Sequence, residues 1–234
     1  MSSIKLPITI NMENQLKAWF DKIKGRGPET SVQPCITLSR EFGCQGYPVA
    51  EALKRLLETP ERPWSILDKT ILEEVAARSG FPITRIDSVS QADPVFRSMI
   101  SLFTSAGQAS SLEIFEYTRQ VIREAATRGN CIIVGRGGTI ITQSLPHCLH
   151  VRLIAPLEFR VRNIAQTQNL EEEAARKLVA TRQSQREEYF RHFTHASASD
   201  PEHYHMILNN ARHTPDEIAR LVAFQLENLG LWAG

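Results

Sequence analysis

Short apolar segments rich in β-branched residues alternate along the chain with longer segments of helical periodicity. The segments that predict strands are 34–39, 64–67, 131–135, 148–155 and 205–210. The segments that predict helices are 49–58, 69–80, pieces near 93–104, 110–130, 156–168, about 170–193 and 214–229. Because the predicted strands lack a polar face, both faces of the sheet must be covered, which is typical of parallel sheets. The pattern therefore predicts an α/β fold with five parallel strands.

The residues before the first predicted strand form a separate segment. Residues 12–24 predict a short amphipathic helix, and the loop over 25–34 is rich in Gly, Pro, Ser and Thr, which marks a boundary. The sequence therefore predicts a helical N-terminal appendage over 1–33 and one main domain over 34–230.

Composition narrows the class of protein. The 234 residues are long enough to bury about 70% of the unfolded surface in a core of their own. With 27 basic and 26 acidic residues the net charge is +1, which excludes a global basic field for nucleic acid or membranes. No apolar run approaches a membrane span, and the first residues lack a secretory signal. The four cysteines are far apart, which fits a reduced compartment, so we expect a cytoplasmic protein.

The first predicted strand runs into residues 40–48, which we name the glycine loop; its sequence is Arg-Glu-Phe-Gly-Cys-Gln-Gly-Tyr-Pro. A strand, a glycine loop and a helix together present backbone N–H groups and a positive helix end to an anion. The loop lacks the lysine and the Ser/Thr of G-x-x-x-x-G-K-[ST]. A turn that needs glycine for its backbone angles alone therefore remains an alternative.

Two further segments strengthen the case for phosphate. Residues 135–139, Gly-Arg-Gly-Gly-Thr, follow the strand 131–135 at the same edge of the sheet, and arginine is a bidentate partner for phosphate. The long charged helix carries Arg182 and Arg186 in a basic stretch diluted by Glu187 and Glu188. It reads either as a solvated face or as an arginine-bearing lid, because phosphoryl transfer depends on charge neutralisation.

Other kinds of chemistry find little support. Histidines gather in the last third of the chain, but no cysteine or carboxylate completes a zinc set with them. The sequence also lacks the G-x-S-x-G of serine hydrolases and the G-x-G-x-x-G of dinucleotide-binding proteins. Cys44 is either an oxidisable thiol near a helix N-terminus or a small filler of a tight loop.

With these motifs in order, the chain resembles the cytidylate kinase-like family, a branch of the P-loop nucleoside monophosphate kinases. The resemblance rests on SREFGCQGYPVAEAL, LDK at 67–69, IIVGRGG, LHVRLIAPLEFRV and YHMILNN. It implies a three-layer P-loop fold with a helical acceptor-binding segment near 68–128 and a lid near 170–200. It further implies ATP and Mg²⁺ as cofactors and a CMP-type nucleoside monophosphate as phosphoryl acceptor.

Carried over by position, the resemblance also implies roles for residues. Asp68 would stand at the entrance of the acceptor segment, Arg136 would hold the acceptor phosphate, and Arg182 and Arg186 would belong to the catalytic lid. The metal ligands are not implied. The residues implied for the phosphates of ATP are Gly43, Cys44, Gln45, Gly46, Tyr47 and Pro48.

The chain departs from the family where the loop charge should stand. Gly46 aligns with the lysine of true cytidylate kinases, and Tyr47 replaces the arginine common in the cytidylate kinase-like branch. Arg40 is our candidate for the missing charge. The alternatives are a non-catalytic nucleotide-binding protein or a kinase for another acceptor. We expect small-molecule nucleotides as partners, neither nucleic acid nor membrane, and leave a homodimer open.

Overall fold

The computed structural model describes residues 33–68 and 111–232. The expected appendage over 1–33, the helices predicted near 69–80 and 93–104, and most of the expected acceptor segment lie outside the described residues, apart from Gln33. No helix in the described part is both long and apolar enough to cross a membrane.

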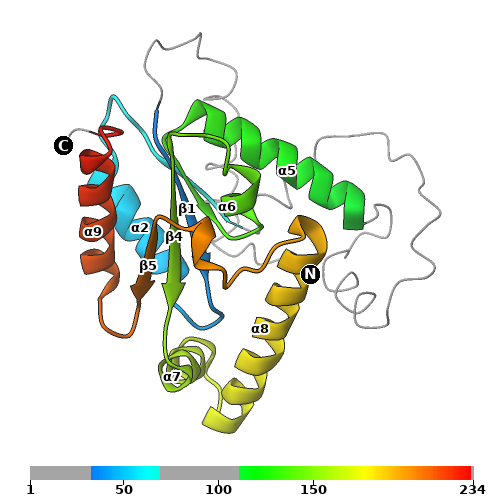
Figure 1. Cartoon of the computed structure of the whole chain (residues 1–234). Helices are drawn as coiled ribbons and strands as arrows, with labels where there is room; N and C mark the ends of the chain where they lie inside the picture. Colours follow the sequence, from blue (N-terminus) through cyan, green and yellow to red (C-terminus); the bar gives the residue numbers. More distant parts are fainter. Residues whose placement is uncertain (1–32, 69–110, 233–234) are drawn as a thin grey trace, which may run out of the picture.

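Five parallel strands form one sheet, as the sequence predicts (Figure 1). Their order is β2-β3-β1-β4-β5, so β1 lies at the centre with β3 on one side and β4 on the other. Cys35 of β1 pairs with Cys131 of β3 and with Cys148 of β4. The strands are β1 (Cys35–Arg40), β2 (Ser65–Leu67), β3 (Cys131–Val134), β4 (Cys148–Ile154) and β5 (Met206–Asn209).

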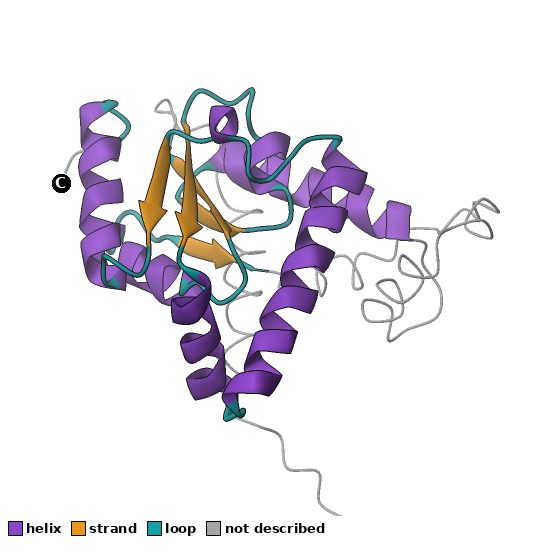
Figure 2. Ribbon diagram, turned by 60° about the horizontal axis from the view of Figure 1, so that its bottom comes forward, coloured by secondary structure: helices purple, strands orange, loops and turns teal. Residues whose placement is uncertain are grey.

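Helices cover both faces of the sheet (Figure 2). The helices α2 (Gly46–Leu57) and α9 (Pro215–Asn228) pack on one face, over the apolar side chains that β1, β3 and β4 direct there. Helix α5 (Ser111–Arg128) packs on the other face, where the three buried cysteines lie, and the short α6 (Gly138–Ile141) follows β3. A Thr214–Glu217 capping box fixes the start of α9, which matches the predicted boundary.

A helical pair projects beyond the carboxyl ends of the strands (Figure 1). The helix α7 (Leu157–Gln168) packs against α8 (Glu172–Thr194) through a small apolar cluster of Val161, Ile164, Ala175 and Val179. The far end of α8 contacts α5, where the rings of Phe193 and Phe115 stack at 4.4 Å. Helix α8 therefore spans the edge of the sheet at which ligands bind in open α/β folds.

The sequence missed two short elements, α6 and a 3₁₀ helix over Pro201–His203. Both are a single turn of helix, too short to show a hydrophobic period. The turn into α6 holds Gly135, Arg136 and Gly137 at positive φ, with values of 80°, 55° and 71°. A non-glycine residue there is strained, and such strain clusters at functional sites.

Candidate functional site

A cavity of about 390 Å³ lies between the carboxyl ends of β1, β3 and β4 and the inner side of α8. That volume falls in the range of about 300–1,000 Å³ typical of small-molecule sites. Four predicted site residues line it, namely Arg40, Arg136, Arg182 and Arg186. Segments more than 140 positions apart in the sequence thus bring their positive charges to one space.

Arg40 reaches from the end of β1 across the glycine loop to the turn after β3. Its aliphatic carbons lie against Gly46, and its guanidinium lies against Gly135, where a side chain would collide with it. Burial is the main cause that lowers its pKa to about 10; the charge of Arg136 lowers it further, whereas Asp68 opposes the shift. The arginine thus occupies the region next to the loop from which the lysine is missing.

Arg186 of α8 completes the approach to the glycine loop. Its guanidinium lies 4.9 Å from the centre of the Phe42 ring and donates to the carbonyl of Arg40 at 3.4 Å. Burial and the charges of neighbouring arginines lower its pKa to about 9. Positive charges held this close repel one another, so the cavity favours an anionic occupant.

Arg136 is held from the other side of the cavity. Its guanidinium lies 5.2 Å from the centre of the Tyr189 ring on α8. Arg182, also on α8, donates to Gln185 at 3.2 Å. An arginine that is stacked on a ring has fewer conformations to lose when it binds a phosphate.

The glycine loop itself does not line the cavity beyond Phe42. Several of its N–H groups already have acceptors within the protein: Phe42 N–H donates to Gln183 Oε1 at 2.8 Å, and Gln45 N–H donates to Asn210 Oδ1 at 2.6 Å. Cys44 and Gly46 donate to carbonyls inside the loop. The predicted phosphate residues Gly43, Cys44, Gln45, Gly46, Tyr47 and Pro48 therefore stand beside the cavity rather than in its wall.

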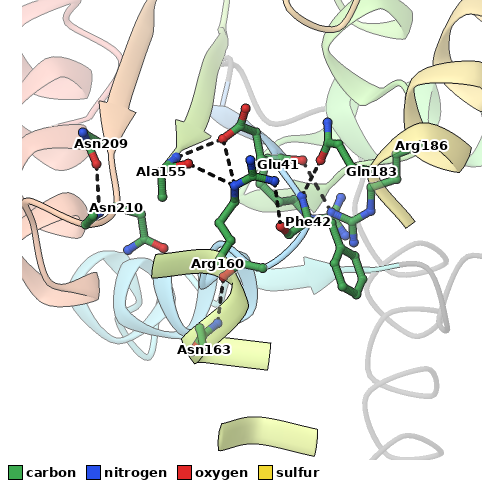
Figure 3. A network of polar contacts seen from close by, with 12 residues as sticks. Glu41, Phe42, Ala155, Arg160, Asn163, Gln183, Arg186, Asn209 and Asn210 are labelled. Carbon is green, nitrogen blue, oxygen red and sulfur yellow. Dashed lines mark hydrogen bonds and ion pairs between the residues drawn. The ribbon is translucent and has the colours of Figure 1, made fainter. Parts of the chain in front are cut away.

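Helix α7 anchors the loop from below (Figure 3). Asn163 donates to the carbonyl of Gly43 at 2.8 Å, and Arg160 donates to the carbonyls of Ala155 and Phe42 and lies 3.5 Å from the Glu41 carboxylate. Gly43 has a φ of 94°, and a side chain there would meet the backbone of Arg160. Arg160 thus anchors the loop and, unlike Arg40 and Arg186, does not line the cavity.

The remaining predicted residues have clear positions. Asp68 follows β2, outside the cavity lining, but its charge acts on both Arg40 and Tyr47. Burial and the charge of Glu41 raise the pKa of the Cys44 thiol to about 12, which favours the loop filler over the oxidisable thiol. Within residues 33–68 and 111–232 no three His, Cys, Asp or Glu side chains gather as a metal site would require.

Sequence reasoning missed Thr37 and Ser39 of β1 and Arg152 of β4, which line the sheet side of the cavity. Thr139, from the predicted turn over 135–139, lines it as well. Thr37 Oγ lies 2.9 Å from His150 Nδ1 and 3.1 Å from Thr139 Oγ. The signal was present as polar residues two apart, at 37 and 39 and at 150 and 152, within otherwise apolar strands.

The fold and the site together define an α/β protein of the P-loop kinase class, with a glycine loop after the central strand and a basic helix over the carboxyl edge of the sheet. The cytidylate kinase-like family matches residues 35–212, and the chain belongs to that family. The match covers every strand of the sheet and the whole of α8.

The comparison with solved structures finds similar chains at low sequence identity, and one of them has a TM-score above 0.5. An uncharacterized protein from Eubacterium ventriosum ATCC 27560 is 18% identical with a TM-score of 0.62, and the comparison covers 84% of this chain and 99% of that one. Shikimate kinase from Bacteroides thetaiotaomicron is 16% identical with a TM-score of 0.48, covering 85% and 99%. Shikimate kinase from Acinetobacter baumannii is 14% identical with a TM-score of 0.47, covering 86% and 96%. No curated protein matches the sequence.

Proposed function

We propose that this protein transfers a phosphoryl group from ATP to a CMP-type nucleoside monophosphate. One observation carries the proposal: four arginines from β1, the β3–α6 turn and α8 surround one cavity at the carboxyl edge of the sheet. Phosphoryl transfer spreads negative charge over the transferred group, so catalysis depends on positioned positive charge more than on covalent chemistry. Membership of a kinase-like family supports the same reaction class.

Each arginine has a distinct part in this proposal. Arg136 holds the acceptor phosphate, while Arg182 and Arg186 bring the charge of α8 over the transferred group. Arg40 takes the place of the absent loop lysine, because its guanidinium already lies between the loop and the turn after β3. The glycine loop receives the phosphates of ATP once Gln183 releases the Phe42 N–H.

The residues present fit a polyphosphate better than they fit a metal ion. Mg²⁺ neutralises phosphate charge in such reactions and usually takes one or two carboxylates or hydroxyls from the protein. With Gly46 at the lysine position, Tyr47 and Pro48 follow in place of the Ser or Thr of the motif, and the Glu41 carboxylate already contacts Arg160 and accepts from Ala155 N–H. Glu187 lines the cavity and accepts from Gln183 at 2.7 Å, and Asp68, outside the lining, acts on Arg40 through its charge. In this proposal the arginines that line the cavity supply the protein's positive charge toward the phosphates.

The loop also favours a second candidate, a non-catalytic nucleotide-binding protein on the kinase fold. The N–H groups of Phe42 and Gln45 are paired inside the protein and the loop lysine is absent, as expected where turnover has been lost. A loop that turns over ATP must exchange these internal acceptors for phosphate oxygens.

Titration calorimetry with ATP–Mg²⁺ and with CMP, followed by a turnover assay, separates the two candidates. A kinase binds both ligands and loses turnover in Arg136→Ala, whereas the matched control Arg220→Ala, exposed on α9, keeps it. A non-catalytic protein binds nucleotide at micromolar concentration, about −8 kcal/mol, without turnover. Wild-type turnover in Arg136→Ala would contradict the assigned site.

A further inference from the structure

Arg152 of β4 is a buried arginine that the proposed transfer leaves without a part. Its side chain is 5% exposed and lines the sheet side of the cavity. The guanidinium donates to Ser39 Oγ at 3.3 Å and lies 5.6 Å from the centre of the Tyr204 ring. No carboxylate in residues 33–68 or 111–232 pairs with it. A buried charge without a counter-charge is costly, so a ligand anion is its natural partner.

Arg152 stands apart from the four arginines already described. Because β1 lies between β3 and β4, the strand that carries Arg152 is two strand spacings, about 9–10 Å, from the strand that leads to Arg136. Each of these arginines lies on its own tyrosine, Arg136 on Tyr189 and Arg152 on Tyr204. The cavity therefore has two separate cationic points on opposite sides of the central strand.

Hydrogen bonds fix Arg152 before any ligand binds. The hydroxyls of Ser39 and Tyr204 lie 3.1 Å apart, and the Tyr204 hydroxyl donates to the carbonyl of Ala198 at 2.8 Å. A guanidinium carries five N–H donors, and Ser39 accepts one of them. The others remain for a ligand in the cavity that Arg152 lines.

We propose that Arg152 binds a second anionic group of the acceptor, a carboxylate or a phosphate, across β1 from the phosphate that Arg136 holds. Both groups offer the pair of oxygens that a guanidinium fork binds in bidentate fashion. The inference rests on the proposed function and sharpens it, since the preferred acceptor is then a molecule with two separate anionic groups.

Matched ligand pairs test the proposal by titration calorimetry on the full chain. UMP is compared with orotidine 5′-monophosphate, which adds one carboxylate, and CMP with cytidine 3′,5′-bisphosphate, which adds one phosphate. We expect at least one doubly anionic ligand to bind about 10- to 100-fold more tightly than its partner, the range of a charge-assisted hydrogen bond. Which pair shows the preference identifies the carboxylate or the phosphate as the second anion.

Variants at the site connect that preference to Arg152. Arg152→Gln removes the preference and leaves monophosphate affinity within about threefold, whereas Arg152→Lys, which keeps the charge but loses the fork, retains part of it. Arg220→Gln is the control and keeps the full preference. If Arg152→Gln fails to fold, the proposal is tested by the affinities of the ligand pairs for the wild-type protein and for Arg152→Lys.

Each result has one meaning. Equal affinities within both pairs, a preference that survives in Arg152→Gln, or a loss of ATP affinity alone in that variant would each overturn the proposal. If ATP fails to bind while the preference persists, phosphoryl transfer is contradicted and the second-anion site is supported. If no nucleotide binds, both proposals are wrong.

Discussion

Replacing Arg40 with methionine tests whether the protein holds a positive charge at the cost of its own stability. The pKa of Arg40 falls to about 10 through burial and the charge of Arg136, which corresponds to about 3 kcal/mol against the charged form in the folded state. Since the side chain is only partly buried, solvent screening reduces this to an expected gain of about 1–2 kcal/mol in the free energy of unfolding for Arg40→Met. Methionine keeps the aliphatic contact with Gly46.

Urea and thermal unfolding without ligand measure the gain. For a chain of this length we expect the midpoint temperature to rise by about 2–8 °C. Calorimetry with ATP–Mg²⁺ measures the affinity of the variant for ATP, which should fall about 10- to 100-fold because a charge-assisted contact is lost. The variant should therefore be more stable and bind ATP less tightly.

The matched control is Arg220→Met on the exposed side of α9, for which we expect neither change. A ligand-free Arg40→Met protein that is less stable than wild type would refute the reasoning about repulsion. Unchanged ATP affinity in Arg40→Met would refute the proposal that Arg40 takes the place of the loop lysine.

Two further predictions concern a turn and a buried histidine. Gly135→Ala places a methyl group against the Arg40 guanidinium at a φ of 80°, so the variant should lose about 1–3 kcal/mol of stability and bind ATP more weakly. The control Gly230→Ala, at a φ of 65° with open space around it, should show only the backbone strain. Equal losses of ATP affinity in the two variants would contradict the role of the Gly135–Arg40 contact. Burial lowers the pKa of His150 to about 4 in the folded protein, so as the pH falls from 6.5 towards 4 the unfolded chain takes up a proton before the folded protein does. The free energy of unfolding, which is highest above pH 6.5, should therefore be about 2 kcal/mol lower at pH 5. Urea unfolding of His150→Asn should lack this component of the pH dependence, and identical pH profiles for both proteins would exclude it.

The hydrophobic pattern was enough to predict the sheet. Its five strands, the helices between them in the described part and their parallel arrangement follow from apolar segments such as 131–135 and from the periodicity of segments such as 156–168. Local sequence also placed the glycine loop and the turn at Arg136 on the same edge, because parallel strands bring their carboxyl ends together. The short helix α6 escaped, because four residues carry no period.

The sequence by itself determined the fold and placed the glycine loop and the turn at Arg136 at one edge of the sheet, with the arginines that make this edge basic. Only the tertiary structure decided which arginines act together, because packing at the loop uses Arg160 as an anchor while α8 brings Arg186 to Arg40. It also decided that the N–H groups of Phe42 and Gln45 donate to Gln183 and Asn210, which are distant in sequence. Arg152 shows the same limit: a charge within an apolar strand gains meaning only when the strand order sets it beside Ser39, buried and facing a cavity. Charge and periodicity are local properties, whereas burial and partnership depend on the whole fold.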